Sequence, residues 1–213
     1  MTIHKNRVDM MWRSNDFPYR KHFTRNKCIF IHIPKAAGTS VLAALGKTKE
    51  KGRDHVSWQV YKKASSRKFA RYYKFTFVRN PYDRALSAYR YILSGGNQGK
   101  QDLAIAKEMA EYSDFDDFVA RGLWQGAFRS HLLFLSQSSF VMDGNETLMV
   151  DFLGHFETLD KDFQQVANKL GISGEIAHRN KGSVEAGGGM TAATREKLAI
   201  LYAQDFVNFG YTP

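Results

Sequence analysis

Apolar residues along this chain form short runs that alternate with longer amphipathic stretches. Strand-like runs cover 28–33, 74–78 and 149–153. Helical spacing, with apolar residues three or four positions apart, extends over 39–46, 81–93, 102–112, 158–170 and 192–206. Because strands and helices alternate, the pattern predicts an α/β fold with a central parallel sheet flanked by helices.

Polar and glycine-rich segments separate these elements. The sequence Ser113-Asp114-Phe115-Asp116 is typical of a helix N-terminus and predicts a short helix that ends near Gly122. Glycine is abundant in 94–100 and in 182–189, which predicts two loops. Each loop fits either a lid over a site or a plain surface connection.

Length and composition fit a single enzyme domain. The chain has 213 residues, of which 43% are hydrophobic, enough for one full core. We expect a basic N-terminal segment over 1–27 and one domain over 28–213. The first segment lacks the apolar stretch of a signal peptide, and no apolar run reaches the roughly 18 residues of a membrane span. The single cysteine, Cys28, cannot form an internal disulfide, so we expect a cytoplasmic protein in a reducing compartment.

The positive charge is concentrated in two parts of the chain. The net charge is +10, with seven basic and two acidic residues in 1–27 and ten and two in 47–74. The remaining residues carry 14 basic and 17 acidic side chains. A local basic surface attracts phosphate-bearing donors and anionic polysaccharides, although a charge run is also typical of a plain solvated face. Because no nucleic-acid motif accompanies the charge, we do not expect nucleic acid as a partner.

A loop of small residues follows the first predicted strand. Pro34 ends the apolar run, and the small residues after it let backbone N–H groups approach a phosphate closely. Two hydroxyl side chains stand at the start of the next predicted helix, whose N-terminus favours an anion. The predicted phosphate-binding residues are Lys35, Ala36, Ala37, Gly38, Thr39 and Ser40. No G-x-x-x-x-G-K-[ST] loop of nucleotide triphosphatases occurs in the chain.

A second segment, 75–89, has a similar organisation. An apolar strand ends at Arg79, and Pro81 opens a helix, where its missing N–H is no loss. Ser87 lies less than two turns beyond Pro81, so Arg79 and Ser87 can converge on one phosphate. Taken alone, each segment also fits a structural turn or a helix cap, but the two in this order favour a binding site.

These segments resemble the sulfotransferases that use 3′-phosphoadenosine 5′-phosphosulfate (PAPS), in particular the carbohydrate sulfotransferase family of type 2. Residues 33–40 are similar to the family loop I-P-K-x-x-G-T-S, and 75–89 to its 3′-phosphate-binding segment. Residues 150–163 resemble the pattern V-D-F-x-G-x-F-E-x-L-x-x-D-F, 178–183 the element H-x-N-x-S, and 205–211 the ending D-x-x-x-F-G-Y. The resemblance implies a sulfotransferase fold related to P-loop nucleotide kinases.

The resemblance also implies roles for particular residues. Lys35 would neutralise the leaving group, Arg79 and Ser87 would bind the 3′-phosphate of the donor, and Lys181 with Gly182 is the nearest candidate for a late basic loop that touches it. Residues 54–57 are similar to the G-H-V-S segment of heparan sulfate 2-O-sulfotransferases, which carries their catalytic base. His55 would then be the base, although Asp54 stands where that family has glycine.

Histidine is the natural general base near neutral pH, and the chain has seven. His131, with the neighbouring Arg129, is the rival of His55, because this stretch could line a cleft for the acceptor. His32 lies in the first predicted strand and is interpreted as structural, with its hydrogen bonds satisfied. His155 belongs to the strand-to-helix element and is interpreted as structural or as a residue behind the site. The other three are His4, His22 and His178.

We therefore expect transfer of a sulfuryl group from PAPS to a hydroxyl, with adenosine 3′,5′-bisphosphate as product and a carbohydrate as acceptor. The sequence shows no metal-ligand cluster, so no metal is expected. The resemblance suits a bacterial enzyme, or a piece of a Golgi enzyme that lacks its membrane anchor. Two alternatives are a small-molecule kinase with an atypical phosphate loop and a nucleotide- or glycan-binding module without catalysis.

Overall fold

The computed structural model describes residues 16–47, 55–176 and 189–213. Its sheet has three parallel strands in the order β1-β2-β3, namely β1 (Cys28–Phe30), β2 (Tyr73–Val78) and β3 (Phe152–His155). Phe75 of β2 is in register with Phe30 on one side and Phe152 on the other. The predicted α/β fold with a parallel sheet is confirmed.

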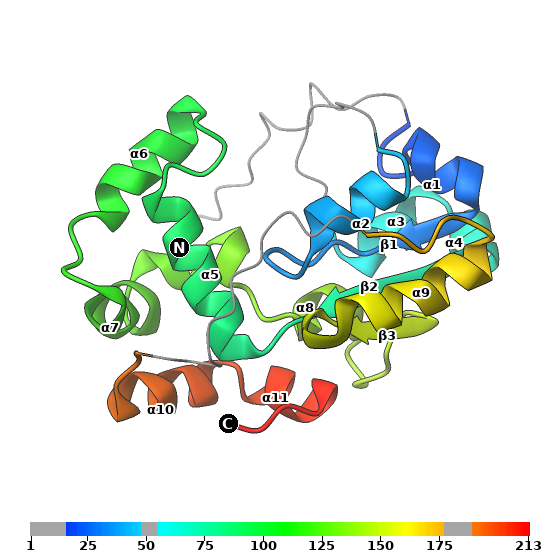
Figure 1. The fold of residues 1–213 in the computed structure, drawn as a ribbon. Helices are drawn as coiled ribbons and strands as arrows, with labels where there is room; N and C mark the ends of the chain where they lie inside the picture. The colour runs from blue at the N-terminus through cyan, green and yellow to red at the C-terminus, as the bar shows by residue number, and fades with distance from the viewer. Residues whose placement is uncertain (1–15, 48–54, 177–188) are drawn as a thin grey trace.

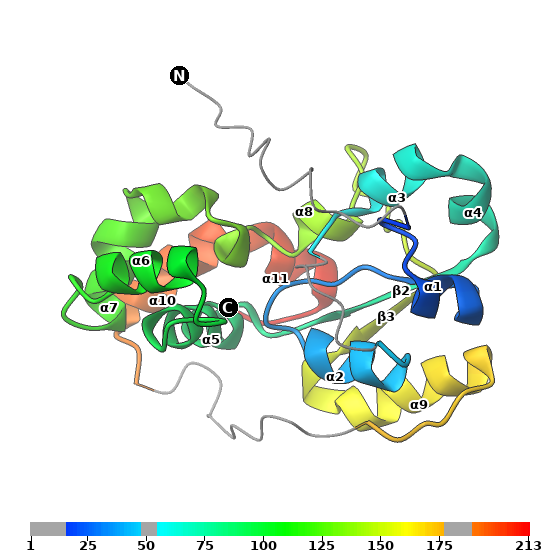
Figure 2. The ribbon, with the colours of Figure 1, turned by 90° about the horizontal axis from the view of Figure 1, so that it is seen from above.

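One part of the molecule, here called the sheet half, consists of the strands and the helices packed on them (Figure 1). From above, α2 and α9 lie on one side of the sheet, and α3, α4 and α8 on the other (Figure 2). The helices of this half are α1 (Lys21–Asn26), α2 (Gly38–Ala44), α3 (Trp58–Ala64), α4 (Ser66–Arg71), α8 (Ser138–Val141) and α9 (Leu159–Leu170), with the 3-10 turn η5 (Phe156–Thr158) before α9.

The other part, the helical half, contains no strand among the described residues and lies to the left in Figure 1. Its longest helix follows directly from β2, so it links the two halves. The elements are α5 (Pro81–Leu93), α6 (Lys100–Met109), α7 (Phe115–Asp117), the π-helix η2 (Phe118–Trp124), the 3-10 turns η3 (Ala127–Ser130) and η4 (Leu132–Phe134), α10 (Ala192–Leu201) and α11 (Ala203–Phe209).

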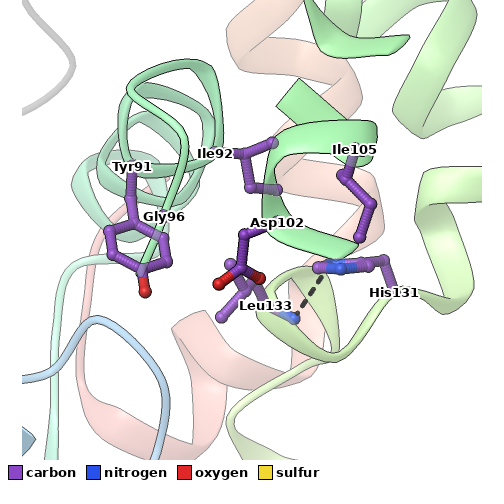
Figure 3. Close-up of a pocket in the computed structure, with 7 residues that line it drawn as sticks. All are labelled: Tyr91, Ile92, Gly96, Asp102, Ile105, His131 and Leu133. Carbon is purple, nitrogen blue, oxygen red and sulfur yellow. Dashed lines mark hydrogen bonds between the residues drawn. The ribbon is translucent and has the colours of Figure 1, made fainter. Parts of the chain in front are cut away.

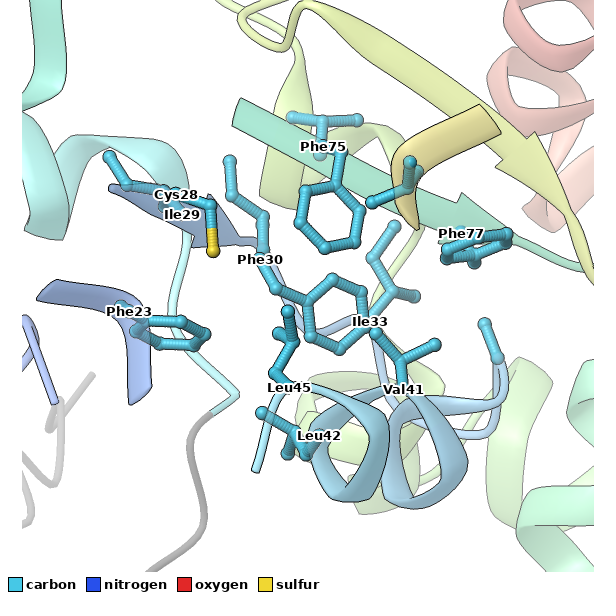
Figure 4. Close-up of a cluster of buried hydrophobic side chains, with 14 of the residues drawn as sticks. Phe23, Cys28, Ile29, Phe30, Ile33, Val41, Leu42, Leu45, Phe75 and Phe77 are labelled. Atoms are coloured by element: carbon cyan, nitrogen blue, oxygen red, sulfur yellow. The ribbon is translucent and has the colours of Figure 1, made fainter. Parts of the chain in front are cut away.

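Each half has its own apolar core. In the sheet half, Phe30, Phe75 and Phe77 are fully buried, and Val41 and Leu42 of α2 face them (Figure 4). This packing holds α2 against the sheet, so the predicted loop before α2 stands on a rigid support. The second core joins α5 to η2, α10 and α11, and it is rich in aromatic rings.

The structure differs from the sequence expectations at several elements. The expected helix over 192–206 is two helices, because the chain turns at Tyr202, whose buried hydroxyl donates to the Phe134 carbonyl at 2.9 Å. The expected short helix widens into η2 at Phe118, since a Cβ at Gly122 would lie 2.8 Å from the Phe118 and Tyr112 rings. Both differences arise from tertiary packing, which local periodicity does not contain. Most of the loop expected over 182–189 lies outside the described residues.

Candidate active site

The loop between β1 and α2 has the backbone geometry of an anion cradle. Lys35 and Ala37 have φ angles of 67° and 64°, whereas the φ of Ala36 between them is not positive. Such alternation aims successive N–H groups into one concavity. Ser40 and Val41 donate back to the Ala37 carbonyl, at 3.0 and 3.2 Å. The four preceding amides, 36 to 39, donate to no acceptor among the described residues.

Gly38 makes room for the His32 ring, which the sequence did not predict. A Cβ at this position would lie 1.6 Å from Nε2 of His32, so the imidazole packs directly against the backbone of the loop. Stacking on Phe30, with 5.5 Å between ring centroids, holds the His32 ring in place. The absent side chain therefore makes room for His32, in addition to the phosphate for which the sequence predicted it.

The side chain of Lys35 contacts the helical half. Its Nζ is 4.0 Å from the ring centroid of Tyr91, which comes from the second half of α5. Burial, together with the nearby positive charge of Arg79, lowers the pKa of Lys35 to about 8. A cation with a lowered pKa gains stability from an anion placed beside it.

Arg79 follows β2 and lies next to the same loop. Its Nη1 is 3.5 Å from the Lys35 carbonyl oxygen, and its guanidinium lies 4.2 Å from the centroid of the Phe156 ring. Burial lowers the pKa of Arg79, and the carboxylates of Asp83 and Glu157 partly oppose that effect. The buried Nε atom of Arg79 has no hydrogen-bond partner among the described residues. Two segments 44 positions apart thus bring two cations together.

Ser87 is half-buried on α5. It precedes Tyr91 by four residues, so both side chains lie on the same face of the helix. Because Tyr91 contacts Nζ of Lys35, this face of α5 adjoins the loop. Thr39 is exposed and Ser40 is buried at the start of α2, while Lys181 and Gly182 lie outside the described residues.

Strand β3 and the turn η5 after it shape the surroundings of Arg79. Glu157 accepts from the backbone N–H of Asn80 at 2.8 Å and from the hydroxyl of Tyr211 at 2.8 Å. Gly154 allows β3 to approach Phe77, since a Cβ there would lie 2.5 Å from that ring. His155, interpreted as structural from the sequence, does pair with a backbone group, the Phe209 carbonyl at 3.1 Å.

His55 stands beside the loop through its contact with His32. The Nδ1 atom of His55 is 3.1 Å from the His32 carbonyl oxygen, and the two ring centroids are 4.0 Å apart. A carbonyl can only accept, so Nδ1 carries the proton and the neutral ring has its acceptor lone pair on Nε2. That tautomer is the one a general base at Nε2 requires.

His32 is structural, as the sequence suggested, but its hydrogen bonds are not all satisfied. Its buried Nδ1 has no hydrogen-bond partner among the described residues. Burial first, and then the charges of His55, Lys47 and Lys35, hold the pKa of His32 well below its usual value. The imidazole is therefore neutral, and its ring packs between Phe30, His55 and Gly38.

His131 occupies a small cavity in the helical half (Figure 3). Its Nδ1 accepts from the backbone N–H of Leu133 at 3.4 Å, so the proton of the neutral ring is on Nε2. The cavity has a volume of about 10 Å³, which leaves room for little more than one water molecule. Arg129 is exposed and does not line it. The other lining residues are Tyr91, Ile92, Gly96, Asp102, Ile105 and Leu133.

Sequence reasoning missed three side chains around the loop. Tyr91 lies below Lys35, Phe156 lies below Arg79, and the amide of Gln137 binds both backbone groups of Arg79. Tyr91 could have been found from its spacing to Ser87, and Phe156 stands inside a segment already singled out. Gln137 belongs to no recognisable pattern, and only the folded chain brings it to Arg79.

No group of three or more His, Cys, Asp or Glu side chains in residues 16–47, 55–176 and 189–213 is arranged as a metal site. In the same residues, every helix is too short or too polar to cross a membrane.

Residues 22–212 match the family model described as the sulfotransferase family. The match includes the loop at Lys35, the segment at Arg79, and the part of the chain that contains His55 and His131. No solved structure matches the chain.

Proposed function

Because the chain belongs to the sulfotransferase family, whose members transfer a sulfuryl group to an acceptor, we propose that its donor is PAPS and that its acceptor is a hydroxyl of a carbohydrate. One observation carries this proposal. Lys35 and Arg79 lie together beside four backbone N–H groups that have no acceptor among the described residues. Two adjacent cations and a row of free donors fit a ligand that carries several negative charges.

The donor would occupy both segments. The amides of 36 to 39, with Thr39 and Ser40, bind the 5′-phosphosulfate end of the nucleotide. Arg79 and Ser87 bind its 3′-phosphate, and Lys181 with Gly182 adds a further contact. The contact between Arg79 and the Lys35 carbonyl supports a single ligand that reaches both segments.

The proposed reaction is an in-line displacement at sulfur. The acceptor oxygen forms a new bond to sulfur while the bond between sulfur and the bridging oxygen of the donor breaks. Nε2 of His55 accepts the hydroxyl proton, and the products are a sulfate ester and adenosine 3′,5′-bisphosphate. The ammonium of Lys35 stabilises the negative charge that develops on the bridging oxygen.

The tautomers of the two candidate bases support His55 over His131. In His55 the proton resides on Nδ1, which leaves Nε2 as the acceptor. In His131 the same reasoning places the proton on Nε2, and the ring lines a cavity smaller than a saccharide site needs. Arg129 and His131 therefore remain only secondary candidates for contact with the acceptor.

The charge on α3 and α4 supports an anionic carbohydrate as acceptor. Both helices follow His55 closely, and no Asp or Glu occurs between residues 55 and 82. Their exposed cationic side chains are Lys62, Lys63, Arg67 and Arg71. A surface of one sign near the proposed base concentrates a polymer of the opposite sign there.

Calorimetry with adenosine 3′,5′-bisphosphate and adenosine 5′-monophosphate tests the donor assignment. We expect the bisphosphate to bind far more tightly, and Arg79→Ala to remove about 2–3 kcal/mol of that preference, which is typical of a charged hydrogen bond. Arg129→Ala, an exposed arginine in the helical half, is the matched control and should leave both affinities unchanged. Equal affinities for the two nucleotides in the wild-type protein would refute the 3′-phosphate site.

Transfer itself is tested with radiolabelled PAPS and a panel of polysaccharides, oligosaccharides and small alcohols. Labelled product should appear with a carbohydrate, and the charge-reversed variant Lys63→Glu should slow transfer to an anionic polymer more than to a neutral one. Turnover that requires ATP and Mg²⁺ would instead favour a kinase. Binding of PAPS without transfer to any member of the panel would favour a non-catalytic module.

A further inference from the structure

The backbone of Arg79 is held by a side chain rather than by a strand. Pairing of β2 with β3 ends at Val78, which is in register with His155. One residue later, the side-chain amide of Gln137 takes the place of a neighbouring strand. Its Oε1 accepts from the Arg79 N–H at 2.9 Å, and its Nε2 donates to the Arg79 carbonyl at 2.8 Å.

Gln137 is itself fixed by Asp205, which comes from α11 near the other end of the chain. One carboxylate oxygen of Asp205 accepts from the backbone N–H of Gln137 at 2.8 Å. The other accepts from the backbone N–H and the hydroxyl of Ser138, both at 2.8 Å. Gln137 and Asp205 are fully buried, so water does not compete for these bonds.

Such an arrangement is costly to bury unless every group is satisfied. Apolar residues would pack at positions 137 and 205 without that risk, yet here a glutamine and an aspartate form a chain of hydrogen bonds that ends on Arg79. These hydrogen bonds fix the backbone of Arg79 where it leaves the sheet, and therefore also the position of its guanidinium over the Phe156 ring.

We propose that Gln137 is a positioning residue that sets Arg79 for the 3′-phosphate of the donor, with Asp205 holding Gln137 in place. This inference rests on the proposed function, because it assumes that Arg79 binds that phosphate. Gln137 does not touch the donor. It acts by holding both backbone groups of Arg79, which leaves the guanidinium for the ligand.

The test is the ratio of two dissociation constants, for adenosine 5′-monophosphate and for adenosine 3′,5′-bisphosphate, measured by calorimetry. Gln137→Met keeps the length of the side chain but removes both hydrogen bonds to Arg79. We expect it to reduce the ratio by about tenfold, equivalent to about 1.4 kcal/mol, with the affinity for the monophosphate nearly unchanged. Gln137→Glu keeps the acceptor for the Arg79 N–H and should give a smaller loss in the same direction.

Ser138→Ala is the matched control. It removes the bond from the Ser138 hydroxyl to Asp205 and the bond that this hydroxyl receives from Asn208, but it leaves Gln137 and Arg79 untouched. The ratio should stay at the wild-type value in this variant. Circular dichroism reports whether each variant is folded. If Gln137→Met does not fold, the comparison is made with Gln137→Glu.

Two other outcomes separate this inference from the proposed function. If Arg79→Ala reduces the ratio but neither Gln137 variant does, Gln137 has no positioning role while the 3′-phosphate site stands. An equal loss of affinity for both nucleotides in the Gln137 variants would also overturn the inference, since it would indicate a general structural role. If Arg79→Ala itself leaves the ratio unchanged, the 3′-phosphate site fails, and the inference fails with it.

Discussion

In the sheet half, His55 donates its Nδ1–H to the carbonyl of His32 at 3.1 Å, beside the loop that carries Lys35. In the helical half, His131 uses the same ring atom to accept from the N–H of Leu133 at 3.4 Å. The first bond leaves the lone pair of the neutral ring on Nε2, whereas the second leaves the proton there. The position of a histidine alone therefore does not show whether it can act as a base. The backbone group bonded to one ring nitrogen decides which nitrogen can accept a proton.

The two halves also treat buried cations differently. Arg84 in the helical half is fully buried, and it donates to the carbonyls of Leu133 and Leu135 at 3.1 and 2.7 Å. Lys35 and Arg79, where the halves meet, each lie against an aromatic ring, with one long contact between them, and the charges of Asp83 and Glu157 also act on Arg79. A buried cation that donates to backbone carbonyls is typical of structure, whereas two cations side by side at an anion-binding loop are typical of a binding site.

The largest expected effect separates the two histidines. His55→Ala should lower turnover by on the order of 10² to 10⁴, because a general base is lost, and should leave the affinity for adenosine 3′,5′-bisphosphate nearly unchanged. His131→Ala is the matched change in the other half, and it should keep most of the activity. Steady-state rates and calorimetry on both variants measure this. The reverse result would assign the base to His131.

Next in size is the effect of Lys35. Lys35→Ala should reduce kcat by roughly a hundredfold, since its charge matters most when the leaving oxygen becomes negative, and should weaken donor binding less. A variant that only raises the KM for the donor would show that Lys35 binds the ground state and the transition state equally. Lys107→Ala, which changes an exposed lysine on α6, provides the comparison with a cation outside the site.

A smaller effect is expected at Gly38. In Gly38→Ala the new methyl group meets the His32 ring, and overpacking of this kind costs about 1–3 kcal/mol. Thermal unfolding should therefore shift downward. Gly144→Ala, where a Cβ meets nothing within 4 Å, should not shift it. If the double variant His32→Ala, Gly38→Ala is no more stable than expected from the sum of the two changes, the ring is not what excludes a side chain at 38.

The smallest effect concerns pH. With its pKa lowered to about 8 by burial and by Arg79, Lys35 loses its proton in the free protein above pH 8. A bound anion favours the charged form, so binding takes up a proton in that range, and the affinity for adenosine 3′,5′-bisphosphate should fall by up to about tenfold per pH unit. Lys35→Arg stays charged and should remove the fall. An identical fall in that variant would point to another group.

In both halves the sequence predicts elements that have local signals better than elements that depend on distant contacts. It does not predict the helices α1, α3, α4 and α8 of the sheet half. β2, α2, α5 and α9 follow from apolar runs, a proline start and regular spacing, all of which are local signals. By contrast, the turn at Tyr202 and the wide helix at Phe118 depend on residues that are distant along the chain. The same division holds at the site, where the loop stands out as a motif but Gln137 does not. Lys181 and Gly182 stay a prediction.

The polar contacts around Arg79 have a consequence for biosynthesis. Asp205 fixes Gln137, and Tyr211 donates to the carboxylate of Glu157 that accepts from Asn80, so residues made later complete the surroundings of residues made much earlier. The three strands can pair before α11 is made, because they contact one another directly. A chain released before residue 205 would have the loop and its cations, but Arg79 would lack the support of Gln137 and Asp205. Under the proposed function, such a chain would bind the donor less tightly.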